Sequence, residues 1–167
     1  MKEFLLNLST QRRYWAALKL IGAVLEGGAL YYPYVLDEWP CVLCIHVRIW
    51  VAAFMLLAMI AIFCTNSIVV TRIMHFLNVG IMAGLVERSW RLLAIERGWI
   101  FGDCDMDLGM PAWFALDKWM PSVFEVQTSC GYTPLIIFEI SMAESLVVIS
   151  ALMLITSAAI FIASWFD

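Results

Sequence analysis

Four cysteines have the residue type and spacing of dithiol–disulfide chemistry. Cys41 and Cys44 form a Cys-x-x-Cys pair, preceded by Pro40 and followed by an apolar run. Cys104 and Cys130 lie in the longest polar stretch of the chain. A disulfide that closes so short a ring as Cys-x-x-Cys is strained, which favours exchange over stapling. The chemistry depends on whether the chain places all four thiols on one side of a membrane.

Other interpretations of the Cys-x-x-Cys pair are weaker. A structural zinc site usually has two short-spaced pairs, and Cys104 and Cys130 are far apart. A c-type haem needs a histidine directly after the second cysteine, and here that position is Ile45. We therefore expect no metal site. A purely structural disulfide is the remaining alternative.

The composition is that of a membrane protein. Hydrophobic residues make up 63% of the 167 residues, charged residues make up 14%, and the mean hydropathy is +0.88. A water-soluble domain of this length needs more charge to cover its surface. The net charge of −4 leaves no basic patch for nucleic acid. We expect a single all-α membrane domain over residues 1–167.

Four apolar windows are long enough to cross a membrane. Each has roughly 20 residues, the length that spans a hydrocarbon core of about 30 Å. The sequence therefore predicts a four-transmembrane-helix bundle, with helices at about 14–32, 45–63, 68–86 and 145–165 and outer loops at about 33–44 and 87–144. In the long loop, the helical spacing of Trp113, Leu116 and Met120 predicts a short helix at 111–121 that lies on the membrane surface.

The positions of basic residues set the expected orientation, because Lys and Arg near helix ends stay on the cytoplasmic side. Arg12 and Arg13 precede the first window, and Arg72 lies near the turn between the second and third windows. The 33–44 loop carries only acidic charges. We therefore expect both termini in the cytoplasm and both loops outside.

This topology sorts the cysteines by compartment. Cys41, Cys44, Cys104 and Cys130 fall on the outer side, where disulfides persist. Four cysteines allow three pairings, and local spacing favours Cys41–Cys44, which leaves Cys104–Cys130. The fifth cysteine, Cys64, falls at the inner end of the second helix, where we expect a free, packed thiol.

Arg48 is the cation best placed to act on the pair. Cys44 falls in the first turn of the second helix, where the helix dipole favours a thiolate. Arg48 is four residues further on, on the same face of the helix. A guanidinium there can stabilise a Cys44 thiolate or the developing oxyanion of a quinone. Glu26, inside the first helix, indicates either a proton path or a neutral, hydrogen-bonded contact between helices.

Together these motifs resemble the DsbB family of bacterial disulfide-bond-formation proteins. The likeness spans nearly the whole chain. It rests on Glu26, on the run Pro40-Cys41-Val42-Leu43-Cys44 leading to Arg48, on Cys104-Asp105, and on Leu116-Asp117-Lys118-Trp119. The resemblance implies a four-helix bundle in the bacterial inner membrane. Such a protein reoxidises DsbA, a periplasmic thioredoxin-like oxidant, and passes the electrons to ubiquinone or menaquinone.

The resemblance also implies a role for each cysteine. Cys41 and Cys44 would be the quinone-coupled pair, with Cys44 and Arg48 at the quinone. Cys104 would form the mixed disulfide with DsbA and would have Cys130 as its partner. Some members of the family use a histidine near the start of the long loop. This chain has none there, but Arg91 lies nearby, where it would take an electrostatic role.

Two further hypotheses stay open beside a protein-dithiol:quinone oxidoreductase. One is a family variant that serves a dedicated thioredoxin-like partner. The other is a non-catalytic membrane scaffold with structural disulfides.

Overall fold

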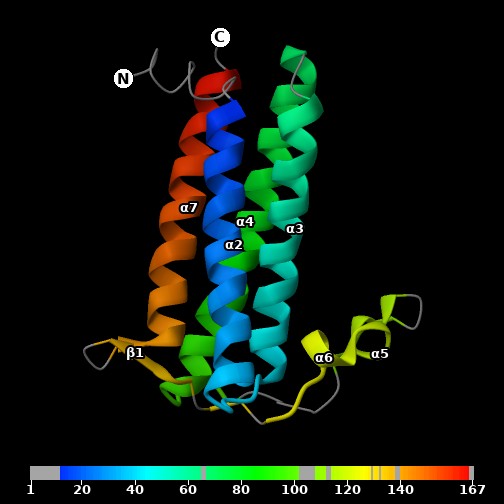
Figure 1. Ribbon diagram of the computed structural model, residues 1–167. Coiled ribbons are helices and arrows are strands. Elements are labelled where there is room, and N and C mark those ends of the chain that lie inside the picture. Colours follow the sequence, from blue (N-terminus) through cyan, green and yellow to red (C-terminus); the bar gives the residue numbers. More distant parts are fainter. Residues whose placement is uncertain are drawn as a thin grey trace.

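Four long helices stand side by side in a bundle (Figure 1). The computed structural model describes residues 12–64, 67–101, 108–111, 114–128, 130–131, 133–137 and 140–165. The long helices are α2 (Arg12–Val35), α3 (Val42–Cys64), α4 (Ile68–Glu96) and α7 (Met142–Trp165). The start of α2 and the end of α7 lie at one end of the bundle, and the elements between α4 and α7 lie at the other.

The surface of the bundle suits a lipid environment. Within the described residues, α3, α4 and α7 are long and apolar enough to cross a membrane. α2 has 24 residues but carries Lys19 and Glu26. Large apolar side chains such as Leu56, Phe76 and Ile155 point outward and are exposed, as expected where hydrocarbon rather than water surrounds the protein.

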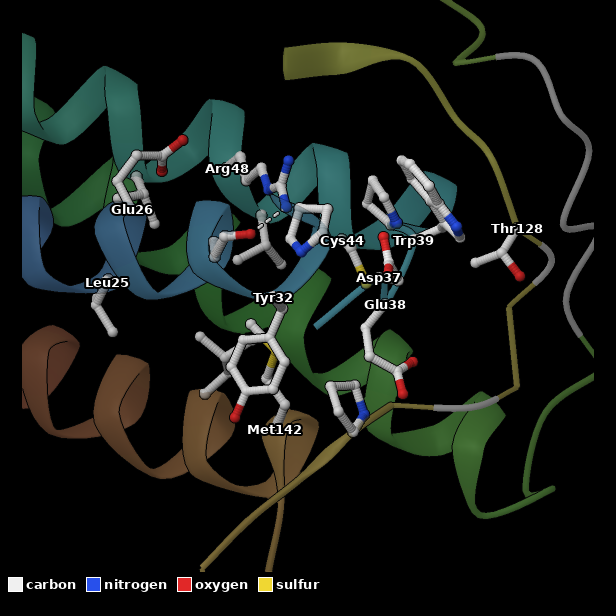
Figure 2. A pocket seen from close by; sticks show the side chains of 17 residues that line it. Leu25, Glu26, Tyr32, Asp37, Glu38, Trp39, Cys44, Arg48, Thr128 and Met142 are labelled. Atoms are coloured by element: carbon white, nitrogen blue, oxygen red, sulfur yellow. Dashed lines mark hydrogen bonds between the residues drawn. The ribbon is translucent and has the colours of Figure 1, made fainter. Parts of the chain in front are cut away.

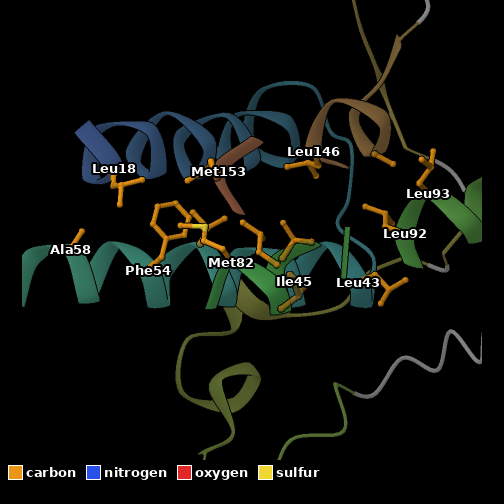
Figure 3. Close-up of a cluster of buried hydrophobic side chains, with 14 of the residues drawn as sticks. Leu18, Leu43, Ile45, Phe54, Ala58, Met82, Leu92, Leu93, Leu146 and Met153 are labelled. Carbon is orange, nitrogen blue, oxygen red and sulfur yellow. The ribbon is translucent and has the colours of Figure 1, made fainter. Parts of the chain in front are cut away.

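An apolar core fills the space between the helices (Figure 3). Phe54 of α3 and Met82 of α4 are completely buried in it, and Leu18 and Met153 join them from α2 and α7. α2 packs on α3, α3 on α4, and α4 on α7. The core therefore joins all the long helices along the bundle.

A buried polar cluster adds hydrogen bonds between helices. The side-chain amide of Asn78 donates to the Ser157 hydroxyl over 2.9 Å and to the Tyr14 hydroxyl over 3.4 Å. These residues come from α4, α7 and α2. In an apolar environment such bonds contribute about 1 kcal/mol each and fix which helix faces meet.

The third long helix extends beyond its predicted end at residue 86. α4 continues to Glu96, so 87–96 is helix rather than loop. Charged residues from Glu87 onward end the apolar window but not the helix, because Glu87 and Arg91 form an i,i+4 ion pair. Leu92 remains buried in the core. The helix stops before Gly98, whose φ of +69° is a left-handed conformation common just after helix ends.

The predicted surface helix at 111–121 is shorter and divided in two. α5 covers Leu116–Trp119 and α6 covers Pro121–Phe124. Pro121 has no N–H to continue α5, and its ring disfavours helical backbone at Met120, where φ is −138° and ψ is 68°. Trp113 lies outside the described residues.

A small hairpin leads into α7. Strands β1 (Leu135–Ile137) and β2 (Ile140–Ser141) pair antiparallel. This hairpin was not predicted from the sequence. α7 then begins with a capping box: the Glu144 N–H donates to the Ser141 hydroxyl, and the Ser141 N–H donates to the Glu144 carboxylate. The box starts the helix at Met142 rather than at the predicted residue 145.

We predict that Gly84→Ala destabilises the bundle and that Gly80→Ala does not. A Cβ at Gly84 would lie 2.7 Å from the ring of Trp50 on α3, so α3 and α4 would have to separate, which costs about 1–3 kcal/mol. A Cβ at Gly80, one turn earlier on α4, meets nothing within 4 Å, and alanine there favours the helix by up to about 1 kcal/mol. Apparent melting temperatures in detergent would test this, and equal values for the two variants would contradict it.

Candidate functional site

The Cys-x-x-Cys pair lies at the start of α3. Pro40 and Cys41 precede the helix, and Cys44 lies in its first turn. The Cys41 carbonyl accepts the N–H of Ile45, which makes Cys41 the residue from which the helix starts. The two Sγ atoms lie 2.8 Å apart, and the Cys44 N–H donates to Cys41 Sγ over 3.4 Å. The three-residue spacing therefore brings both sulfurs together on one helical turn.

A third cysteine of the predicted set reaches this pair. Cys130 hydrogen bonds to Cys41, and the backbone holds the two segments together. The Gln127 N–H donates to the Pro40 carbonyl over 3.2 Å, and Thr128 forms a parallel bridge with Cys41. The structure thus brings together Cys41, Cys44 and Cys130. Cys104 lies outside the described residues.

Cys41 is held as a neutral thiol. Its side chain is only 1% exposed. The hydrogen bond with Cys130 lowers the pKa of the Cys41 thiol, but the hydrogen bond with Cys44 and burial outweigh it and raise that pKa to about 12. At neutral pH the nucleophile of the pair is therefore not Cys41.

A cavity opens beside Cys44 (Figure 2). It lies between α2, α3, the start of α7 and the segment before Cys41, and its lining includes Glu26, Cys44, Arg48 and Leu146. Its volume is about 180 Å³, which exceeds the roughly 150 Å³ of an engineered cavity that binds benzene. The cavity can therefore hold one six-membered ring. Cys41 is not among its lining residues.

Arg48 is buried in the wall of this cavity, with 4% of its surface exposed. One guanidinium nitrogen, Nη1, donates to the Val123 carbonyl of α6 over 3.1 Å. The other, Nη2, donates to the Ala29 carbonyl of α2. Nε has no partner among the described residues. The side chain thus connects α3 to α2 and to the loop, and its Nε is left without a partner in the cavity wall.

Pro33 explains why the Ala29 carbonyl is available. In a regular helix this carbonyl would accept the N–H of residue 33, four positions on. Proline has no N–H, and Pro33 lies inside α2. Because an unpaired carbonyl in an apolar environment is costly, the Arg48 guanidinium and the freed carbonyl satisfy each other.

Two positions differ from the sequence expectations. Cys64 is exposed at the far end of α3 rather than packed. Arg91 pairs with Glu87 on the surface of α4 and does not line the cavity.

Sequence reasoning also missed a contact that positions the long loop. The imidazole Nε2 of His46 forms a hydrogen bond with the Leu108 carbonyl over 3.2 Å. Leu108 is buried, four residues after Cys104. No signal in the sequence pairs these two positions, because the contact joins a helix to a distant loop.

Fold and site together define a multi-pass helical membrane protein with thiols gathered at one end of its bundle. The family DsbB, described as disulfide bond formation protein DsbB, matches residues 11–160. The chain therefore belongs to the DsbB family. This confirms the family and the four-helix membrane fold that the sequence motifs predicted, and it implies oxidoreductase activity at the level of the family.

Similar proteins align with most or all of the chain. Disulfide bond formation protein B of Photorhabdus laumondii subsp. laumondii is 27% identical over 168 residues, which cover 100% of this chain and 99% of the relative. Disulfide bond formation protein B 2 of Pseudomonas aeruginosa is 30% identical over 129 residues, 76% of each chain. Disulfide bond formation protein B of Pseudoalteromonas atlantica is 28% identical over 154 residues, 89% of this chain and 88% of the relative.

The first prediction from the site concerns Pro33 and Arg48. Arg48→Gln leaves the Ala29 carbonyl without its donor, which costs about 1–3 kcal/mol. In a protein that already carries Pro33→Ala, Arg48→Gln should lower the free energy of unfolding by less, because the N–H of the new alanine donates to the Ala29 carbonyl. Free energies of unfolding in mixed micelles for the two single variants and the double variant would give the coupling energy, expected at about 0.5–3 kcal/mol. If the losses of the two single variants add up to the loss of the double variant, Pro33 and Arg48 are not linked in this way.

The second prediction concerns the reactivity of Cys41. In the reduced, folded protein, iodoacetamide should label Cys41 at pH 8 about 1,000-fold more slowly than an ordinary thiol, because only the thiolate reacts. Since the pKa is raised to about 12, the labelling rate should rise with pH throughout the range between 8 and about 12. Mass spectrometry of labelled peptides would measure it, with the unfolded protein as the control. An ordinary rate in the folded protein would contradict the assignment.

Proposed function

We propose that this protein is a membrane thiol oxidoreductase, a protein-dithiol:quinone oxidoreductase. It reoxidises a periplasmic thioredoxin-like dithiol protein of the DsbA kind and passes the electrons to ubiquinone or menaquinone. The observation that carries the proposal is the position of Cys41. It contacts the loop cysteine Cys130 on one side and Cys44 on the other, and Cys44 alone of the three lines the cavity.

The contacts support a relay of thiol–disulfide exchanges. A thiolate of the partner protein attacks the Cys104–Cys130 disulfide at Cys104 and releases Cys130. The Cys130 thiolate then attacks Cys41 Sγ in the Cys41–Cys44 disulfide, and Cys44 leaves as a thiolate. The partner's second thiolate attacks its mixed disulfide with Cys104, so the partner departs oxidised. The freed Cys104 thiolate attacks Cys130, which restores the Cys104–Cys130 disulfide and leaves Cys41 and Cys44 reduced. Each step breaks one S–S bond and forms another, so geometry and thiolate character decide the rates.

The residues around Cys44 fit a quinone head group. The cavity is large enough for one ring, and the unpartnered Nε of Arg48 is a donor for a carbonyl oxygen. Cys44 and Arg48 would hold the group. A bound quinone supplies an acceptor for two electrons and two protons. The Arg48 guanidinium stabilises negative charge both on the Cys44 sulfur and at the cavity wall.

Energetics indicate why a terminal acceptor is needed. A DsbA-like oxidant has a potential near −120 mV, whereas ordinary structural disulfides lie below about −300 mV. Oxidising such a partner with an ordinary disulfide is uphill by about 180 mV, or about 8 kcal/mol for two electrons. A labile Cys41–Cys44 disulfide and coupling to the quinone pool together overcome this difference.

We also propose an inner-membrane location with both termini in the cytoplasm. Arg12, Arg13 and Arg72 lie at the end of the bundle opposite the cysteine cluster. Basic residues mark the cytoplasmic side, so the cysteine cluster would face the periplasm. Disulfides persist in that compartment.

A turnover assay tests the proposal. Purified protein in detergent is mixed with ubiquinone or menaquinone and an excess of a reduced DsbA-like protein. We expect quinone absorbance to fall and the partner to become oxidised. Cys44→Ser should abolish both changes, because the relay then lacks its terminal thiolate. Cys64→Ser is the matched control and should retain full turnover, since Cys64 is exposed at the other end of α3.

The variants also separate catalysis from a scaffold role. If Cys44→Ser lowers only the melting temperature and the native protein consumes neither quinone, the protein is a scaffold and the proposal is wrong. If the native protein consumes quinone only with one particular thioredoxin-like protein, the partner is a dedicated one.

A further inference from the structure

Two buried polar atoms at the cavity have no partner among the described residues. They are Oε2 of Glu26 and Nε of Arg48. Both side chains line the cavity, and Figure 2 shows them on one side of Cys44, with Thr128 on the other. A buried polar atom without a hydrogen bond costs about 1–3 kcal/mol. The wall at this end of the cavity therefore holds hydrogen-bonding capacity that the described residues leave unused.

We propose that Glu26 donates a proton to one oxygen of the quinone as it is reduced. The inference rests on the proposed function above. Oxidation of the Cys41–Cys44 dithiol to the disulfide releases two electrons and two protons. Reduction of a quinone to its hydroquinone takes up two electrons and two protons, one proton at each of two oxygens on opposite sides of the ring. The electrons leave through Cys44, and Glu26 carries one of the protons.

Among the described residues that line the cavity, Glu26 is the group that can deliver a proton at this end. Arg48 lies beside it, but a guanidinium does not give up its proton in proteins. Asp37 and Glu38 line the cavity beside Cys44, in the loop between α2 and α3, and Figure 2 shows them farther from Glu26 than Arg48 is. Tyr32 also lines the cavity, but Figure 2 shows its ring pointing away from Arg48, so Glu26 is the acid nearest to that guanidinium.

Glu26 and Arg48 therefore have complementary tasks. The Arg48 Nε–H is a fixed donor that orients an oxygen without transferring a proton. The Glu26 carboxyl can donate to that oxygen before reduction and accept a hydrogen bond from the resulting hydroxyl afterwards. A positioned general acid typically contributes about 100- to 10,000-fold to a rate.

The test uses Glu26→Gln, which keeps the size and hydrogen-bonding capacity of the side chain but carries no acidic proton. In a single turnover, quinone reduction should slow by about 100-fold or more, while quinone still binds. A readout independent of rate is the infrared difference spectrum between the reduced and oxidised quinone-loaded protein. The native protein should show a carboxyl C=O band that Glu26→Gln lacks.

Two further variants complete the comparison. Glu26→Asp keeps an acid on a shorter side chain, so it should show a shifted band and recover part of the rate. Glu125→Gln is the matched control, because Glu125 is an exposed carboxylate outside the cavity. It should leave both the band and the rate unchanged. If Glu26→Gln does not fold, Glu26→Asp is the deciding variant. A carboxyl C=O band that is unshifted in Glu26→Asp would show that the band does not come from Glu26 and would overturn the proposal.

The outcomes distinguish this inference from the proposed function. If the native protein reduces no quinone, the proposed function fails and the role of Glu26 fails with it. If the native protein reduces quinone but Glu26→Gln matches its rate, keeps the carboxyl band or no longer binds quinone, only the role of Glu26 as proton donor is overturned.

Discussion

The buried guanidinium of Arg48 is the interaction on which the site depends. A positive charge with 4% of its surface exposed needs acceptors on all sides. Ala29 on α2 and Val123 on α6 supply two of them as backbone carbonyls. The Arg48 side chain therefore holds α2, α6 and the cavity wall in position. Moving any one of these parts would leave a buried charge or carbonyl unpaired.

The apolar environment makes this arrangement possible. In water, a carbonyl freed by a proline would be solvated and would attract no buried arginine. Within a bilayer every backbone polar group must find a partner inside the protein. Pro33 removes one helical hydrogen bond at the depth where Arg48 lies. The unpaired Ala29 carbonyl then accepts a hydrogen bond from the buried guanidinium, so both groups gain a partner. A proline and an arginine that each look unfavourable in a membrane helix are favourable as a pair.

The sequence predicts the parts of this protein that follow from local chemistry. Cys-x-x-Cys spacing, apolar windows and the turn from Cys44 to Arg48 are local, so helices and candidate residues could be predicted from them. Hydropathy did not predict where α4 ends, because ion pairs such as Glu87–Arg91 extend a helix beyond its apolar part. Contacts between distant segments, such as Arg48 with Ala29, could not be predicted, since neither residue type specifies its partner.

The start of α3 separates two environments with a single helical turn. The sulfurs of Cys41 and Cys44 are in contact, yet Cys41 faces the loop cysteine Cys130 and Cys44 lines the cavity. Cys41 suits the role of the sulfur that is attacked in the Cys41–Cys44 disulfide, because it faces the loop thiol Cys130 and its own raised pKa makes it the poorer leaving group. A Cys44 close to the Arg48 charge suits the role of a sulfur that leaves. In the relay proposed above, the Cys-x-x-Cys turn is therefore the boundary between the protein partner and the quinone, which exchange electrons without meeting.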